Sequence, residues 1–328
     1  MPHDPGMYRR DFRGEYILLT VYVEDLLYTG SSNELLEQFE KSLAGHVDIT
    51  CNHDMKQFLE LNISYSPETI RLSAAKYAEE LGKRFKIAPA PLSTLYRTPG
   101  PNHKPSNKAL SPAGLHTYQQ QLGCLLFASV TCTPDLSYIA SQLALYSRKP
   151  TAENLLDLQR ALQFFISTPN VGLCYSIIPT SSFNLIGYVD ADHVADPNNR
   201  RSKTGFLFRP EPSGPISWNS QKQELVALSS AEVEFIAATA AIRKGLYLQE
   251  LLQEAKIPAL ANLRLHCDNQ SAIRIANKPG FVSHTKHIAL RYFFVKDEVD
   301  KGKVDLTYCP MGDMAANFLT KRLSRQQY

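Results

Sequence analysis

The stretch from Gly187 to Glu234 constrains the fold more strongly than any other part of this chain of 328 residues. It begins with an apolar run that ends in Asp190, passes two more strand-like runs, and enters a long helix that carries Glu234 in its first turn. A carboxylate at a strand end and another at a helix start can share a divalent cation, because hard cations prefer oxygen ligands. We therefore expect a mixed α/β module over residues 181–328.

The long helix contains two glutamates, and helical spacing predicts which of them faces the sheet. The helix start, Ser229-Ser230-Ala231-Glu232, matches a capping box. The face that begins at Glu234 continues with small and apolar residues, namely Ala238, Ala241, Gly245, Leu248 and Leu252. The face that begins at Glu232 continues with Thr239 and Arg243. Since a helix packs its apolar stripe against the core, we expect Glu234 to point at the sheet and Glu232 at solvent.

The rest of the module supplies a third carboxylate. Residues Leu263–Cys267 alternate between apolar and polar side chains, which predicts a strand that delivers Asp268 at its end. Two helices, a strand and a last helix are expected after it, at residues 269–276, 285–301, 304–308 and 312–321. On the last helix, Asp313 and Asn317 share a face one turn apart.

The first 180 residues show a different arrangement of acidic residues. Two apolar runs, Tyr16–Val23 and Leu26–Tyr28, flank Glu24-Asp25, which predicts a β-hairpin with carboxylates at its tip. The alternative is that these two residues only occupy a solvated turn. Residues 1–15 are polar and lack a packing pattern, so we expect a disordered leader or a truncation scar there.

Further elements of the first half have no catalytic spacing, and packing explains them. After a helix that starts at Ser32-Asn33, we expect a hairpin, a helix, a proline-rich connection and helical segments, at residues 58–72, 74–86, 87–112, 118–145 and 152–166. Residues 168–172 mark the turn into the second module. The predicted division is therefore 1–15, 16–180 and 181–328.

Composition limits the classes of partner and the cellular compartment. The net charge of +3 permits a nucleic-acid partner without demonstrating one. Six cysteines without CxxC pairing predict free thiols and an intracellular location, cytoplasmic or nuclear. The longest apolar runs are of strand length, so we expect no membrane partner.

Several segments of this sequence resemble one known family. The segments are GYVDAD, RRSKTGFLF, PISWNSQKQELVALSSAEVEFIA, CDNQSAI, TKHIALRYFFV and AANFLTK. In order, they resemble the ribonuclease H domain of copia-type retrotransposon Pol polyproteins and cover most of residues 185–322. In the first half, YVEDLLYTG resembles the YVDD hairpin of the reverse transcriptase palm. The segments FLELNISYSPETIRLSAAKYAEELGKRF and LGCLLFASVTCTPDLSYIASQL resemble the regions that follow it.

The resemblance implies a fold and a set of metal ligands. It implies a ribonuclease H-like mixed sheet with flanking helices, preceded by a partial α+β reverse transcriptase with palm, thumb and connection regions. Position by position, it assigns binding of Mg²⁺ or Mn²⁺ to Asp190, Glu234 and Asp268. The fourth acidic position of the family falls on Asn317, because AANFLTK stands where the family has a pattern like ADxxTK. An amide offers one neutral oxygen, so this degenerate position is expected to weaken a second metal site, and Asp313 is a poor substitute.

The polymerase site is degenerate by the same comparison. Glu24 stands where the family has its first aspartate, and the extra methylene moves the carboxylate by roughly 1.5 Å. Asp25 matches the second aspartate. Residues 1–15 show no apolar strand with the family's earlier acid. RNA-directed DNA polymerase activity is therefore not expected from this chain alone.

Basic and aromatic side chains are candidates for nucleic-acid contact. They are Arg200, Arg201, Lys286, His287 and Arg291, with Trp218 as the aromatic candidate. For each of them the alternative is a solvated face or, for Trp218, a core position. Both interpretations stay open at the level of sequence.

Three functions are compatible with these patterns. The first is a ribonuclease H-type endonuclease that cuts the RNA strand of RNA–DNA hybrids with Mg²⁺. The second is a non-catalytic retroelement remnant that folds and at most binds nucleic acid. The third is a host protein that uses the fold as an interaction surface. Other parts of a retroelement polyprotein are possible partners under the first two.

Overall fold

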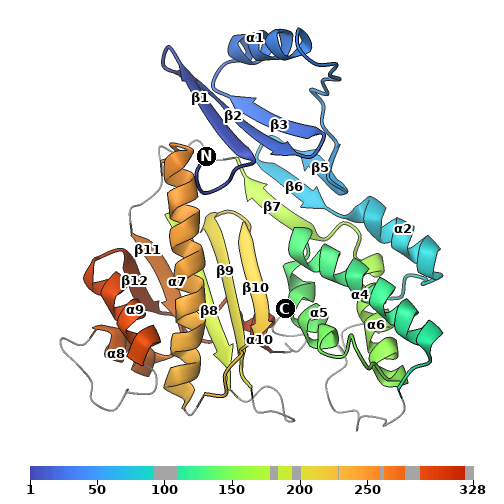
Figure 1. Cartoon of the computed structure of the whole chain (residues 1–328), viewed down its shortest axis with the longest axis vertical. Coiled ribbons are helices and arrows are strands. Elements are labelled where there is room, and N and C mark those ends of the chain that lie inside the picture. The colour runs from blue at the N-terminus through green and yellow to red at the C-terminus, as the bar shows by residue number, and fades with distance from the viewer. Residues whose placement is uncertain are drawn as a thin grey trace.

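Three β-sheets organise the part of the chain that the structure describes (Figure 1). The structure is a computed structural model, and it describes residues 1–91, 109–177, 184–193, 201–227, 229–258, 262–277 and 289–321. In the described residues, the sheets have the strand orders β1-β2-β3, β4-β5-β6-β7 and β10-β9-β8-β11-β12. The first two sheets contain strands from the first half of the chain, and the third contains the strands of the expected second module.

The first sheet is the expected acidic hairpin with one additional strand. Strands β2 (Glu15–Tyr22) and β3 (Asp25–Gly30) pair antiparallel, so Glu24 lies in the connecting turn. Helix α1 (Asn33–Ala44) follows, and its first turn is capped by the Ser32 hydroxyl, which accepts from the Leu35 amide. Figure 1 shows α1 beside this sheet at one end of the molecule.

The additional strand, β1 (Met7–Phe12), corrects the expectation of a disordered leader over residues 1–15. It pairs antiparallel with β2 along its whole length. The turn between them contains Arg13 and Gly14, both with positive φ. The strand escapes a search for apolar alternation because it lies at the edge of its sheet, where only one neighbour must be satisfied and polar side chains are tolerated. One of them, Arg9, places its guanidinium 4.2 Å from the centre of the Tyr16 ring.

The second sheet closes the first half of the chain. It consists of β4 (Gln57–Phe58), β5 (Leu61–Tyr65), β6 (Thr69–Ser73) and β7 (Gly172–Ser176). Strand β7 pairs antiparallel with β6 from about a hundred residues away in sequence, so the segment after residue 171 still belongs to the first half. The boundary near residue 180 stays a prediction, since residues 178–183 lie outside the described part.

Helices pack beside this second sheet and form a core of their own. They are α2 (Ala75–Phe85), α4 (Pro112–Thr131), the 3₁₀ turn η1 (Pro134–Leu136), α5 (Ser137–Ala144) and α6 (Ala152–Ser167). Leucines and alanines fill the space between them, and the buried Tyr118 hydroxyl donates to the Leu143 carbonyl at 2.7 Å. The helical expectations for this region are confirmed, and most of the proline-rich connection lies outside the described residues.

The third sheet is a mixed sheet of five strands. Its members are β8 (Asn184–Asp192), β9 (Lys203–Glu211), β10 (Ser217–Lys222), β11 (Leu263–Cys267) and β12 (Val304–Tyr308). Strands β8, β9 and β10 pair antiparallel, whereas β11 runs parallel to both β8 and β12. This sheet with its flanking helices confirms the expected ribonuclease H-like fold class.

Helices cover both faces of the third sheet. Figure 1 shows the long helix α7 (Ser230–Glu254) lying along one face, with α8 (Gln270–Asn277) and α9 (Ala289–Asp300) beside it. These helices bury Val189, Phe208 and Leu265. The short helix α10 (Asn317–Thr320) packs on the opposite face against side chains that include Ile186 and Tyr188. No helix among the described residues combines the length and apolar content that crossing a bilayer requires.

The two halves of the chain share a hydrogen-bonded boundary. The Trp218 indole of β10 donates to the Ser129 carbonyl of α4 at 2.7 Å. On β9, the buried Lys203 amino group donates to the Ser141 hydroxyl of α5 at 2.5 Å. Trp218 therefore contributes to packing between the halves, as the core alternative for this residue predicted.

Candidate metal centre

Two parallel strands bring two of the predicted ligands to the same edge of the third sheet. In the register of β8 and β11, Val189 lies opposite Cys267. Asp190 and Asp268 directly follow this pair, one on each strand. Because neighbouring parallel strands end on the same side of a sheet, the two carboxylates are brought to a common edge, as the sequence predicted.

Helix α7 contributes the third predicted ligand from above the sheet. Its start is fixed by the Ser229 hydroxyl, which accepts from the Glu232 amide at 3.2 Å. Helix α7 can lie close to the sheet because Gly245 has no side chain. A Cβ atom at this position would overlap the Leu263 side chain. Glu234 is only 8% exposed and faces the sheet, so the orientation predicted from helical spacing is confirmed for this residue.

The expectation that Glu232 points at solvent is wrong, since this residue is only 6% exposed. The spacing argument assumes that a helix is covered on one face alone. Here the segment that leads into α7 also packs beside its first turn. The buried Gln223 side chain in that segment donates to the Val233 carbonyl and to the Thr204 hydroxyl, both at 3.0 Å.

Three possible ligand atoms converge within this region. Glu234, Cys267 and Asp268 each offer one such atom, and these atoms lie within 4.8 Å of one another. Asp190, only 3% exposed, lies near enough for its negative charge to act on Glu234 and Asp268. One oxygen of Glu234, Oε2, is buried and has no hydrogen-bond partner in the structure.

The electrostatics of the cluster favour binding of a cation. Burial, followed by the negative charges of Asp268 and Asp190, raises the pKa of Glu234 to about 8. Burial and then the charge of Asp190 raise the pKa of Asp268 and of Asp192 above their usual range. Each shift shows that another negative charge is costly at this place, and a bound cation would remove that cost.

Asp190 is held by the last described helix. The Thr320 hydroxyl donates to Asp190 Oδ2, and the Lys321 ammonium lies 3.7 Å from the same oxygen. Gly205 lies opposite Asp190 in the β8–β9 ladder. A Cβ atom there would come within 2.7 Å of Thr320 Cγ2 and 2.8 Å of Leu319 Cβ, so only glycine lets α10 approach this closely.

Asn317, the degenerate fourth position, is also buried at this helix. Its amide nitrogen donates to the Met311 carbonyl at 2.6 Å, while its Oδ1 atom has no hydrogen-bond partner. The helix expected over residues 312–321 is wrong in its first half, because Asp313 lies in an exposed turn. Pro310 and Gly312 disfavour a helix at this point.

The donor set fits a hard divalent cation such as Mg²⁺ or Mn²⁺. Asp190, Glu234 and Asp268 supply carboxylate oxygens, and the unpaired Oδ1 of Asn317 is a neutral oxygen of the kind that such ions also accept. A buried oxygen without a partner is unfavourable unless a ligand satisfies it. Three carboxylates and one amide suit one tightly bound metal ion better than two metal ions.

The candidates for nucleic-acid contact are only partly described. Arg201 is exposed and lies two residues before Lys203. In the β8–β9 ladder Lys203 lies opposite Asp192, at the end of the sheet that carries the carboxylates. Arg291 is half-buried on α9. Arg200, Lys286 and His287 lie outside the described residues, so their roles stay predictions.

The acidic hairpin of the first half shows no comparable convergence. Glu24 and Asp25 are both exposed. Within the described ranges, neither belongs to a group of three side chains that could hold a metal ion. The structure therefore agrees with the solvated-turn alternative for these residues.

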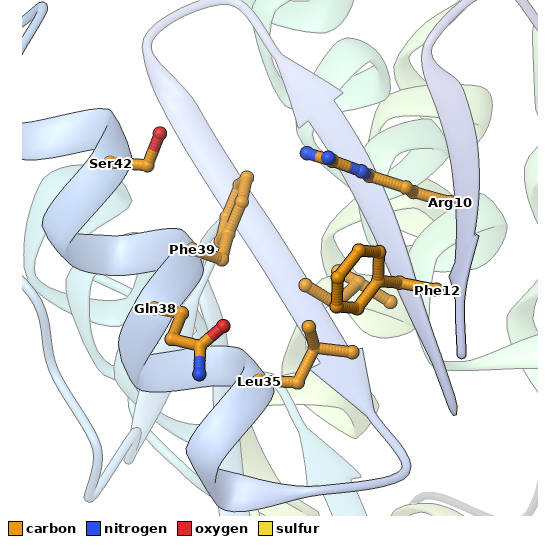
Figure 2. Close-up of a pocket in the computed structure, with 7 residues that line it drawn as sticks. Arg10, Phe12, Leu35, Gln38, Phe39 and Ser42 are labelled. Carbon is orange, nitrogen blue, oxygen red and sulfur yellow. The ribbon is translucent and has the colours of Figure 1, made fainter. Parts of the chain in front are cut away.

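A cavity of about 220 Å³ lies between the first sheet and helix α1 (Figure 2). Figure 2 shows Phe12, Leu35 and Phe39 around it, with Arg10 and Gln38 at its border. No acidic side chain lines it, so it contributes nothing to a metal centre.

Comparisons with known proteins cover almost the whole chain. Residues 1–95 match the family described as reverse transcriptase (RNA-dependent DNA polymerase). The retrovirus-related Pol polyprotein from transposon TNT 1-94 of Nicotiana tabacum is 29% identical, over 99% of this chain and 25% of that protein. The corresponding polyprotein from transposon RE1 of Arabidopsis thaliana is 30% identical, over 96% of this chain and 21% of that protein. The chain thus spans a quarter or less of the length of these relatives.

A solved structure that matches is RNase H1 from the halophilic archaeon Halobacterium salinarum NRC-1. It is 13% identical and has a TM-score of 0.30, and the match covers 40% of this chain and 90% of that one.

Three residues of the site were not predicted from the sequence as ligands or supports. Cys267 was predicted only as the last residue of a strand, and Thr320 and Lys321 were only part of a family pattern. Thr320 and Asp190 are 130 residues apart, so nothing in local spacing could have connected them.

Proposed function

This chain belongs to the retrovirus-related Pol polyproteins of transposons, and we propose that residues 181–328 form a metal-dependent nuclease for the RNA strand of RNA–DNA hybrids. The observation that carries the proposal is that Glu234 and Asp268 offer ligand atoms within 4.8 Å of one another. Asp190 follows the neighbouring strand at the same edge, near enough for its charge to act on both. Such a cluster, with two buried carboxylates and a half-buried one, is unfavourable without a cation. Its chemistry is that of phosphodiester hydrolysis with a bound divalent metal.

The residues of the chain have separable tasks in this proposal. Asp190, Glu234 and Asp268 would hold Mg²⁺ or Mn²⁺, which when bound lowers the pKa of a water molecule and stabilises the leaving oxygen. Thr320 and Lys321 keep the Asp190 carboxylate in place through the contacts described above. Arg201 lies at the same end of the sheet, where it can contact a phosphate.

A second candidate function is a nucleic-acid-binding remnant without catalysis. The observation that favours it is Asn317, whose amide replaces a charge and donates to the Met311 carbonyl. Under this alternative the chain binds a hybrid but does not cut it, and Asn317→Asp restores cleavage. The exposed hairpin at Glu24-Asp25 gives no support for polymerase activity in this chain.

Cleavage of a hybrid by the full chain tests the proposal. A hybrid with a labelled RNA strand is incubated with the protein in Mg²⁺ or Mn²⁺, and the RNA products are measured. We expect Asp190→Asn to lower the rate at least about 100-fold, since loss of groups that only orient metal ligands already costs 10–100-fold. The matched control Asp25→Asn, in the exposed hairpin, keeps the wild-type rate. Equal rates for wild type and Asp190→Asn contradict the proposal.

An intracellular location belongs to the same proposal. All six cysteines are free thiols, which suits a reducing compartment. Imaging of a tagged chain in the cytoplasm or nucleus would support it, and recovery from the extracellular medium would contradict it.

A further inference from the structure

We propose that the carboxylate cluster is also a site for thiophilic divalent cations such as Zn²⁺ and Cd²⁺, with the sulfur of Cys267 as a ligand beside Glu234 and Asp268. Binding of such an ion excludes Mg²⁺ or Mn²⁺ and so inhibits the nuclease. The inhibitory part rests on the proposed function. The binding part rests on the geometry of the three side chains alone.

The geometry brings one sulfur and two carboxylates toward one point. Cys267 continues the buried face of β11 beneath α7 and is 3% exposed. Its Sγ atom and one oxygen each of Glu234 and Asp268 lie within 4.8 Å of one another. Around a tetrahedral zinc ion, with bonds of about 2.1–2.3 Å, such atoms lie roughly 3.5 Å apart. The three ligand atoms would have to move about 1 Å closer to one another, which rotation of the side chains can provide.

An unsatisfied oxygen gives a second reason to expect an ion here. Glu234 is more than nine-tenths buried, and its Oε2 atom has no hydrogen-bond partner in the structure. The Cys267 sulfur accepts a hydrogen bond of 3.4 Å from the Asn269 backbone amide, which leaves further electron pairs on the sulfur. Buried polar groups in native proteins are normally paired. A cation at this point would satisfy the Glu234 oxygen and use the free electron pairs of the sulfur.

Ligand softness separates the two classes of ion. Mg²⁺ binds oxygen and has little affinity for sulfur, so its site relies on the carboxylates. Zn²⁺ and Cd²⁺ bind thiolate strongly. On binding, the Cys267 thiol loses its proton to solvent, and the sulfur–metal bond forms. Since both classes of ion require Glu234 and Asp268, they compete for the same place.

Cobalt titration of the full chain tests the binding directly. Co²⁺ reports a thiolate ligand through near-ultraviolet charge-transfer absorption, so the readout does not depend on nuclease activity. We expect this absorption in wild type and in Cys132→Ala, which removes a buried thiol from the other half of the chain. We expect it to disappear in Cys267→Ser, which is close to cysteine in size and keeps the fold. Full absorption in Cys267→Ser, or none in wild type at saturating Co²⁺, overturns the inference.

Competition links the inference to the proposed function while keeping their failures apart. We expect Zn²⁺ to inhibit hybrid cleavage by wild type at concentrations at least about 10-fold lower than for Cys267→Ser, as expected for loss of one metal ligand. Equal inhibition of both proteins contradicts the inhibitory role. A cobalt signal through Cys267 in a chain that cleaves no hybrid supports this site and rejects the nuclease. Cleavage of the hybrid without any cobalt signal supports the nuclease and rejects this site.

Discussion

Acidic side chains lie in different surroundings in the two halves of this chain. At the hairpin, Glu24 and Asp25 are neighbours in sequence and both are exposed. At the third sheet, Asp190, Glu234 and Asp268 come from three elements and meet at one edge, where Asp190 and Glu234 are buried and Asp268 is half-buried. Adjacency in the sequence alone does not gather charge here, since Glu24 lies in the turn, Asp25 begins β3, and both side chains meet solvent. Convergence of distant elements does, and burial then makes the gathered charges depend on a cation.

The largest expected difference between the two regions is in the pH dependence of stability. Because the pKa of Glu234 is raised to about 8 in the fold, the folded protein holds a proton that the unfolded chain releases near pH 4.5. Its stability without metal should therefore fall as the pH rises from about 4.5 to 8. The loss is on the order of 3–5 kcal/mol, at 1.36 kcal/mol per pKa unit.

Denaturant unfolding in EDTA, repeated across this pH range, measures the effect. Glu234→Gln has no carboxyl group to ionise, so its free energy of unfolding should fall less steeply and exceed that of wild type at pH 8. Parallel curves for the two proteins would show that Glu234 is not responsible.

The next largest difference is stabilisation by metal. A ligand that binds only the folded state at 100 times its Kd adds about 2.7 kcal/mol to the free energy of unfolding. We expect Mn²⁺ to give such a gain at pH 7.5 in wild type and in the double variant Glu24→Gln/Asp25→Asn. The gain should be absent in Asp268→Asn. If the hairpin variant loses the gain, the metal binds in the first half of the chain, and the prediction is contradicted.

A smaller effect is expected where a glycine permits contact with the site. Gly205→Ala forces α10 away from β9, and overpacking of this kind costs about 1–3 kcal/mol. It should also weaken Mn²⁺ binding, because Thr320 then leaves Asp190. Gly123→Ala is the matched control in the first half. A Cβ atom there meets nothing within 4 Å inside α4, so this change should stabilise by roughly 0.5–1 kcal/mol. Equal changes in the free energy of unfolding for Gly205→Ala and Gly123→Ala would contradict the role of close packing at Gly205.

The smallest effect is expected at the hairpin itself. Exposed charges without special contacts change stability by about 0.5 kcal/mol or less when replaced. Glu24→Gln and Asp25→Asn should therefore leave the free energy of unfolding within this range, with or without Mn²⁺. Thermal unfolding of both variants in Mn²⁺ and in EDTA is the measurement. A loss above 1 kcal/mol would reveal a role that exposure does not suggest.

Periodicity in the sequence predicted much of the third sheet and part of its site. The strands Leu263–Cys267 and Val304–Tyr308 were predicted to the residue. The inward orientation of Glu234 also followed from helical spacing. Burial of Glu232 did not, because the covering segment around Gln223 packs there only in three dimensions.

Other features depended on contacts that local pattern does not contain. Strand β1 is polar and exists because β2 offers a free edge. Cys267 lies on the face of the sheet that α7 covers, and only the position of α7 brings Glu234 to it. The hydrogen bond from Thr320 to Asp190 closes a loop of 130 residues.

The contact between Lys203 and Ser141 has a consequence for where this chain can be divided. Burial lowers the pKa of Lys203 to about 7, and the ring of Tyr138, 4.7 Å from its amino group, also comes from α5. Proteolysis between residues 177 and 184 followed by separation of the pieces would remove α5 and its contacts from Lys203. Lys203 would then meet water and regain its charge beside Asp192. The smallest autonomous unit of this fold thus includes α5 and extends beyond the strands and helices that define its class.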